Sequence, residues 1–109
     1  MKNTNYWVYI LYCENDTYYT GYTNDIIKRY QSHLDGTGKC KYTRSFKPLR
    51  IAQCWKINGD KSLAMQIEAA IKKLSRPEKE KIIANPCLLL SHPRFSMFPR
   101  ECIEIIPLK

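Results

Sequence analysis

Hydrophobic and polar residues follow two different periods along this chain, and the change from one to the other marks its predicted elements. Between residues 7 and 23, aromatic and β-branched residues form two short runs separated by Glu14-Asn15-Asp16. Such residues favour strands and the Asn-Asp pair favours a tight turn, so this segment is predicted to be a β-hairpin. Apolar side chains then recur every four residues, at Ile26, Tyr30 and Leu34, which predicts an amphipathic helix.

Boundary signals place this first helix and the basic segment that follows it. Thr23 or Asn24 can cap a helix that begins near Asp25, and the glycines at positions 36 and 38 end it. Residues 35–48, DGTGKCKYTRSFKP, are predicted to form a loop. Loops of this length are usually functional or mobile.

The second half of the chain contains one more strand and two more helices. Residues 49–57 are predicted to form the third strand, and Asp60 caps a helix after the turn at 58–59. Ser75 and Glu78 form a capping box that opens a short helix ending near Ala84. The predicted fold class is α+β, a small three-stranded mixed or antiparallel sheet flanked by helices in the order β-β-α-β-α-α.

The last 25 residues have a different character. Four of the six prolines fall there, together with several large apolar residues. Proline at this density argues against a regular element, whereas the apolar residues argue against a free tail. We therefore predict a folded domain over residues 1–84 and a proline-rich extension over residues 85–109, which packs on the domain or on a partner, either another protein or a second copy as a homodimer.

Length and composition limit the class of protein. A chain of 109 residues is sufficient for one hydrophobic core, and 44% hydrophobic with 26% charged residues excludes wholesale disorder. No apolar run could span a bilayer and the N-terminus lacks a signal-peptide cleavage site, so a cytoplasmic protein is expected. The five cysteines lack the CxxC spacing typical of zinc sites, which disfavours a structural metal.

Positive charge is concentrated in the middle of the chain. The net charge is +8, and residues 24–56 hold eight basic and two acidic side chains, so eight minus two, or +6, lies in this segment. A concentrated positive field favours binding to a polyanion such as nucleic acid, because phosphate contacts release condensed counterions. Charge alone leaves a merely solvated basic surface open as the alternative.

Five polar side chains could carry chemistry, and each also has an ordinary structural role. A strand tyrosine such as Tyr9 or Tyr19 usually packs, and Arg29 would usually be solvated. Glu68 lies four residues before a lysine, which suits a helix-surface ion pair, and His33 could simply make a local hydrogen bond. Only their joint arrangement distinguishes these alternatives.

That joint arrangement resembles the GIY-YIG nuclease superfamily. Trp7-Val8-Tyr9 stands where Gly-Ile-Tyr would be, and Tyr19-Thr20-Gly21 stands where Tyr-Ile-Gly would be. Arg29 and His33 match the first helix of the family, and Glu68 matches its later glutamate. The likeness runs from about residue 6 to residue 83 and is greatest to small single-domain bacterial uncharacterised members (UPF0213-like), which share YTGYT, GKxKYTR and KKLSRxEKE. Trp7 and Thr20 depart from the family pattern.

The resemblance implies a metal-dependent endonuclease that hydrolyses phosphodiester bonds in DNA and leaves a 5′-phosphate and a 3′-hydroxyl. Glu68 would hold one divalent metal, Mg²⁺ or as an alternative Mn²⁺, because hard cations prefer carboxylates. Tyr9 would act as general base or proton relay, Tyr19 would orient water or the metal's shell, and Arg29 would hold the scissile phosphate. His33 would hydrogen-bond to a tyrosine.

Substrate contacts outside this centre are predicted from charge. Lys28, Lys39, Lys41 and Arg44 are expected to bind flanking phosphates, and Gly21 is expected to allow close packing of backbone. A small domain with a shallow basic face is expected to recognise DNA structure or single strands instead of base sequence, with RNA left open as a substrate. The expected role is DNA repair or processing. The alternatives are a non-catalytic nucleic-acid-binding module of the same fold and an interaction protein that uses the extension.

Overall fold

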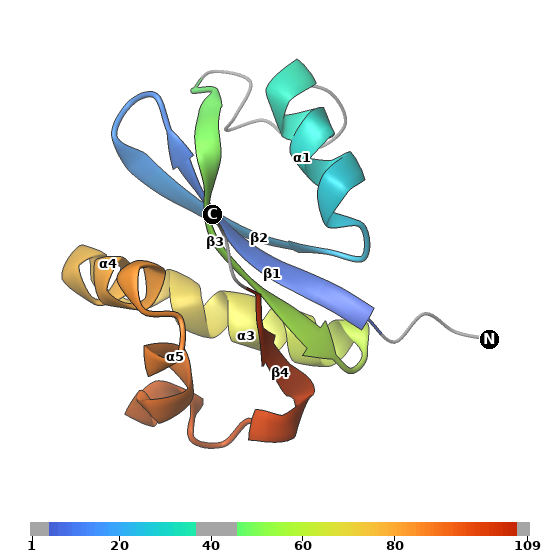
Figure 1. The fold of residues 1–109 in the computed structure, drawn as a ribbon, viewed down its shortest axis with the longest axis vertical. Helices are drawn as coiled ribbons and strands as arrows, with labels where there is room; N and C mark the ends of the chain where they lie inside the picture. Colours follow the sequence, from blue (N-terminus) through green and yellow to red (C-terminus); the bar gives the residue numbers. More distant parts are fainter. Residues whose placement is uncertain (1–4, 37–45, 107–109) are drawn as a thin grey trace.

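The computed structural model describes residues 5–36 and 46–106, which form a sheet covered by helices on both faces. Helix α1 (Ile26–Asp35) lies on one face, and α3 (Lys61–Lys72), α4 (Arg76–Ala84) and α5 (Leu88–Ser91) lie on the other (Figure 1). The predicted α+β class is confirmed. The predicted loop residues Lys39, Lys41 and Arg44 lie outside the described residues.

The hairpin forms as its pattern predicts. Strand β1 (Asn5–Cys13) pairs antiparallel with β2 (Thr17–Thr23). Asp16 closes the turn at φ 60°, a left-handed conformation that Asp tolerates better than most residues. Strand β3 (Pro48–Asn58) pairs antiparallel with the other side of β1. Within the described residues, β2 is therefore an edge strand whose outer side pairs with no strand.

The predicted three-stranded sheet is wrong, because the described sheet has four strands. Residues Ile103–Ile105 form β4, which pairs antiparallel with β3 and places Ile103 opposite Ile57. Every pairing in the order β2-β1-β3-β4 is antiparallel. A three-residue strand is too short to show a period of its own, so only its pairing with the distant β3 identifies it.

Helix caps match the sequence signals with one shift. The cap of α1 is Asp25, whose Oδ1 accepts from Lys28 N at 3.1 Å, so the predicted cap at Thr23 or Asn24 is wrong by one or two residues. Thr23 instead accepts from Asp25 N through its hydroxyl, at 3.1 Å, and fixes the chain before the helix. Gly36 ends α1 at φ 69°. Asp60 caps α3, and the capping box of α4 forms as predicted.

The proline-rich extension contains regular structure, contrary to expectation. It holds α5, two 3-10 helices (Pro93–Phe95 and Arg100–Cys102) and β4. Its described prolines, Pro86, Pro93 and Pro99, precede or begin these elements, at positions where proline loses no hydrogen bond, so they start structure instead of breaking it. Leu89, Phe95 and Phe98 lie in the same buried cluster as Trp55 of β3, so the extension completes the core beneath α3.

A hydrogen-bonded histidine ties the extension to α4. His92 Nδ1 accepts from the backbone N–H of Arg94 at 3.1 Å, so Nε2 carries the ring proton and donates to Glu78 Oε2 at 2.8 Å. This bond, together with the capping box, lowers the pKa of Glu78 to about 2. Throughout the two described ranges, no helix has the length and apolar character needed to cross a membrane.

Candidate active site

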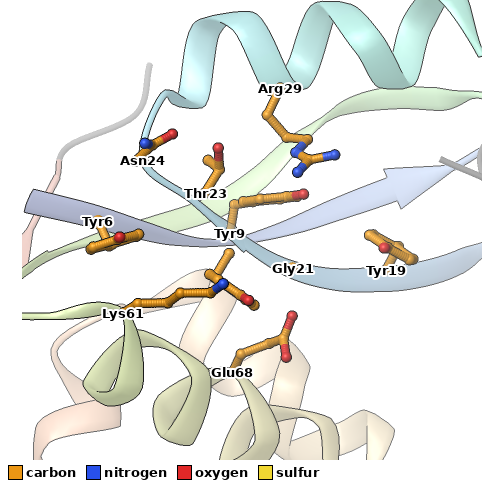
Figure 2. A pocket seen from close by; sticks show the side chains of 10 residues that line it. Tyr6, Tyr9, Tyr19, Gly21, Thr23, Asn24, Arg29, Lys61 and Glu68 are labelled. Carbon is orange, nitrogen blue, oxygen red and sulfur yellow. The ribbon is translucent and has the colours of Figure 1, made fainter. Parts of the chain in front are cut away.

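A pocket of about 430 Å³ lies at the outer edge of β2, between α1 on one face of the sheet and α3 on the other (Figure 2). It is lined by Tyr6, Tyr9, Tyr19, Gly21, Tyr22, Thr23, Asn24, Arg29, Lys61 and Glu68. Tyr9, Tyr19, Arg29 and Glu68 come from four different elements, so the fold brings together four side chains that the sequence separates by up to 59 positions. These four side chains therefore converge on one pocket.

Tyr9 depends on the glycine opposite it. Tyr9 of β1 and Gly21 of β2 are direct partners in the ladder, and the tyrosine ring lies over the glycine. A Cβ atom added to Gly21 would lie 2.5 Å from Tyr9 Oη and 2.7 Å from Tyr9 Cζ, closer than real contacts allow. Gly21 therefore makes room for a side-chain ring, whereas the predicted reason was close packing of backbone.

His33 lies behind Tyr9 and holds its hydroxyl. His33 Nε2 and Tyr9 Oη share a buried hydrogen bond of 2.9 Å, as predicted for a tyrosine partner. The imidazole also makes edge-on contacts with both tyrosines, at 5.7 Å between ring centroids for Tyr9 and 5.2 Å for Tyr19. Although the helix stripe predicted Ile26 and Tyr30 as the buried face of α1, His33 is its most buried side chain, only 1% exposed.

Burial keeps this histidine neutral. Desolvation, reinforced by the positive charge of Arg29, lowers the pKa of His33 from 6.5 to about 4. The neutral ring can accept a hydrogen bond from the Tyr9 hydroxyl or donate one to it, depending on its tautomer. The hydrogen bond therefore orients the hydroxyl without adding a second positive charge beside Arg29.

The low pKa of His33 predicts a loss of stability in mild acid. Between the two pKa values the unfolded chain binds a proton that the folded protein does not, so the free energy of unfolding falls as pH falls from 6.5 toward 4. We expect a loss of about 2 kcal/mol between pH 7.5 and pH 5. Urea unfolding at several pH values measures it, and His33→Gln, which keeps a polar partner for Tyr9, should flatten the slope. An equally steep slope in that variant would assign the effect to other groups.

Arg29 and Lys28 extend positive charge along the start of α1. Arg29 lines the main pocket, and Figure 2 shows its guanidinium directed toward the space above Tyr9. Lys28 lines a second pocket of about 290 Å³ that shares Thr23, Asn24 and Arg29 with the first. Lys28 is thus next to the predicted centre, at a place where a neighbouring phosphate could bind.

Glu68 faces the pocket from α3. Its side chain is 17% exposed, and it pairs with Lys72 one turn later at 3.6 Å, so the predicted helix-surface ion pair is also present. Burial raises the pKa of Glu68, although Lys72 opposes this shift. The Glu68 carboxylate is thus partly shielded from water, which strengthens its electrostatic attraction for a cation.

The donor set of the pocket fits a hard divalent cation with one protein ligand. Glu68 is the single carboxylate among its described lining residues, and residues 5–36 and 46–106 contain no cluster of three or more His, Cys, Asp or Glu side chains that could enclose a metal. Mg²⁺ commonly takes one or two carboxylates and fills its other positions with water and substrate phosphate oxygens. A pocket of this size leaves room for both.

The two departures from the family pattern are sequence neighbours of residues that line the pocket. The ammonium of Lys56 lies over the ring of Trp7, 5.9 Å from its centroid. Trp7 lines neither of the two pockets as the described residues define them. Thr20 is 4% exposed, and within the described ranges its hydroxyl is the one buried side-chain oxygen without a hydrogen-bond partner. An isoleucine there would have no such unmet polar group.

Sequence reasoning missed part of the pocket wall. Five residues that line it were not predicted as site residues, namely Tyr6, Tyr22, Thr23, Asn24 and Lys61. One signal could have found Lys61, since it lies seven residues before Glu68 and two helical turns bring the pair onto one face. Tyr6 carries no such signal, because the chain has eight tyrosines.

Comparison with known proteins decides the family. Residues 5–81 match the GIY-YIG catalytic domain, a region that includes every described residue of the pocket. The chain belongs to the GIY-YIG family. This places it in a nuclease superfamily, whose substrates are nucleic acids, and confirms the resemblance of its motifs.

Several GIY-YIG relatives are similar over most of their length. The UPF0213 protein BH0048 of Halalkalibacterium halodurans is 41% identical over 80 residues, which cover 73% of this chain and 83% of that protein. The UPF0213 protein FN1575 of Fusobacterium nucleatum is 40% identical over 81 residues, covering 74% and 79%. The solution NMR structure of BH0048 from Bacillus halodurans aligns with a TM-score of 0.47, covering 73% of this chain and 83% of that one.

Proposed function

We propose that this protein is a divalent-metal-dependent endonuclease that hydrolyses phosphodiester bonds in DNA. The observation that carries the proposal is the pocket itself. One sheet edge brings together a guanidinium, a tyrosine hydroxyl bonded to a neutral buried histidine, and a partly buried carboxylate. Phosphodiester hydrolysis needs these functions, namely charge stabilisation, a proton acceptor for the attacking water and a cation-binding group.

Tyr9 is the proposed proton acceptor or relay. Its hydroxyl lines the pocket and is held by His33 at 2.9 Å, so its direction is set before substrate binds. The positive charge of Arg29, on the same side of the sheet, favours an anionic phenolate. Because His33 stays neutral, it positions the Tyr9 hydroxyl without placing a second positive charge beside Arg29.

Arg29 is the proposed ligand of the scissile phosphate. A guanidinium presents a planar fork of donors that matches two phosphoryl oxygens, and it remains charged throughout the pH range of the reaction. Tyr19, on the strand beside Gly21, would orient water at the other end of the pocket. Lys28, Lys39, Lys41 and Arg44 are proposed to hold flanking phosphates.

Glu68 is the proposed metal-binding residue. A bound divalent cation would supply Lewis-acid stabilisation of the phosphoryl oxygens and of the leaving 3′-oxygen. Glu68 contributes an ionised carboxylate at a partly dry site, and Lys72 keeps that carboxylate oriented on α3. We further propose that the enzyme recognises DNA structure instead of base sequence, in DNA repair or processing in the cytoplasm.

Replacing Tyr9 by phenylalanine tests this proposal. The variant keeps the ring over Gly21 but loses the hydroxyl, so cleavage of labelled DNA with Mg²⁺ or Mn²⁺ should fall about 10²- to 10³-fold while DNA affinity is retained. Tyr18→Phe is the matched control, since Tyr18 lies on the same hairpin outside the pocket, against Arg76. Cleavage products should carry a 5′-phosphate.

Two outcomes would contradict the proposal. Equal cleavage by wild type and Tyr9→Phe would remove Tyr9 from the chemistry. DNA binding with no cleavage by wild type on any of duplex, branched and single-stranded substrates would instead favour the non-catalytic binding module.

A further inference from the structure

Lys61 and two tyrosines, Tyr6 and Tyr22, line one end of the pocket, and none of the three has a role in the proposed catalysis. Figure 2 shows Tyr6 and Lys61 together at the end away from Tyr19. Lys61 is the first residue of α3, after the capping residue Asp60. Because seven residues make nearly two full turns, Lys61 lies on the same helix face as Glu68 and about 10 Å from it along the axis.

The ammonium of Lys61 makes no ion pair with any described residue. The nearest acid in sequence, Asp60, is engaged as the helix cap and accepts from Leu63 N at 2.9 Å. Lys72, at the other end of α3, is by contrast paired with Glu68. Lys61 is exposed and lines the pocket, so it offers a positive charge to a ligand about two helical turns from the carboxylate.

Tyr6 and Tyr22 add aromatic surface beside this charge. Tyr22 pairs directly with Val8, and Tyr6 is two residues before Val8, so the two tyrosines are diagonal neighbours on the face of the sheet that α3 covers. Both are half-buried, with their inner parts packed against the main core cluster. Both line the pocket.

From this arrangement we infer that Lys61, Tyr6 and Tyr22 form a subsite for one unpaired nucleotide next to the scissile phosphate. Lys61 binds the phosphate of that nucleotide and the ring of Tyr22 stacks on its base beside Tyr6, a combination typical of single-strand binding. The bound nucleic-acid strand then crosses the unpaired edge of β2, from Arg29 on one face of the sheet to Lys61 on the other. A base held in a duplex could not turn its face to these rings.

The inference rests on the proposed function for its position relative to the scissile phosphate, but its test does not require cleavage. Binding of a labelled single-stranded oligonucleotide is measured without metal at several salt concentrations. Lys61→Ala should weaken affinity about threefold to tenfold and reduce the slope of log K against log salt by about 0.7, the value for one lost contact. Lys61→Arg should restore both. Lys73→Ala, an exposed lysine at the C-terminal cap of the same helix, should change neither.

The proposed base stacking is tested by removing single bases from the oligonucleotide. A series of oligonucleotides with one abasic position each is bound to wild type and to Tyr22→Leu, which keeps an apolar side chain against the core. One abasic position should weaken wild-type binding roughly tenfold and Tyr22→Leu much less. An unchanged salt slope in Lys61→Ala, or equal abasic effects in both proteins, would overturn the subsite. Cleavage that still required Glu68 would then leave the proposed function standing.

Discussion

Replacing Glu68 by glutamine should abolish cleavage, with a loss of roughly 10⁴-fold, while the folded protein becomes no less stable. Glutamine has nearly the same shape but no charge, so it cannot hold a divalent cation of this kind. Cleavage of the preferred DNA substrate with Mg²⁺ or Mn²⁺ measures the first effect, and thermal unfolding measures the second. Cleavage by wild type should likewise fall as pH falls toward the raised pKa of Glu68.

The stability result follows from the sign of the pKa shift. Burial raises the pKa of Glu68, so the folded protein binds this proton more tightly than the unfolded chain does. Stability therefore falls as pH rises through that range, and at neutral pH the ionised carboxylate is a net cost to folding. Removing its charge should leave the midpoint of unfolding unchanged or raise it by a few degrees.

Glu80→Gln is the matched control for this variant. Glu80 also pairs with a basic residue four positions away, Arg76 at 3.2 Å, but it is half-exposed on α4 outside the pocket. It should retain full cleavage. Substantial cleavage by Glu68→Gln would contradict the proposal that Glu68 binds the metal. A thermal unfolding midpoint well below that of wild type would mean that Glu68 has a structural role.

Truncating Phe95 to alanine should cost about 3–5 kcal/mol of unfolding free energy, the usual range for a fully buried phenylalanine. Phe95 is 2% exposed in the main core cluster and contacts the rings of His92 and Phe98. Urea unfolding measures the loss. Met97→Ala, two residues away and 80% exposed, should change stability by less than about 0.5 kcal/mol. Similar small effects for both would show that the extension is dispensable for folding.

Local signals in the chain were sufficient for most of the element order. The hairpin turn at residues 14–16, the cap at Asp60 and the box at Ser75 and Glu78 each depend on residues a few positions apart, and all appear where predicted. The candidate site residues had no such local signal and were predicted from the resemblance of their motifs to a nuclease family, whose catalytic domain residues 5–81 match. Short-range geometry sets the turn and the caps, so the sequence alone is enough to predict them.

Other features depended on contacts between distant segments. Strand β4 exists only because β3 offers it an edge to pair with, and its three residues carry no periodic signal. Gly21 matters because the register places it under Tyr9, and His33 is neutral because α1 buries it against two tyrosines. Lys61 joins the site only when α3 lies beside the free edge of β2. Sequence order therefore determined which groups the protein carries, whereas burial and register, which depend on the whole chain, decided which of them meet and in what state of charge.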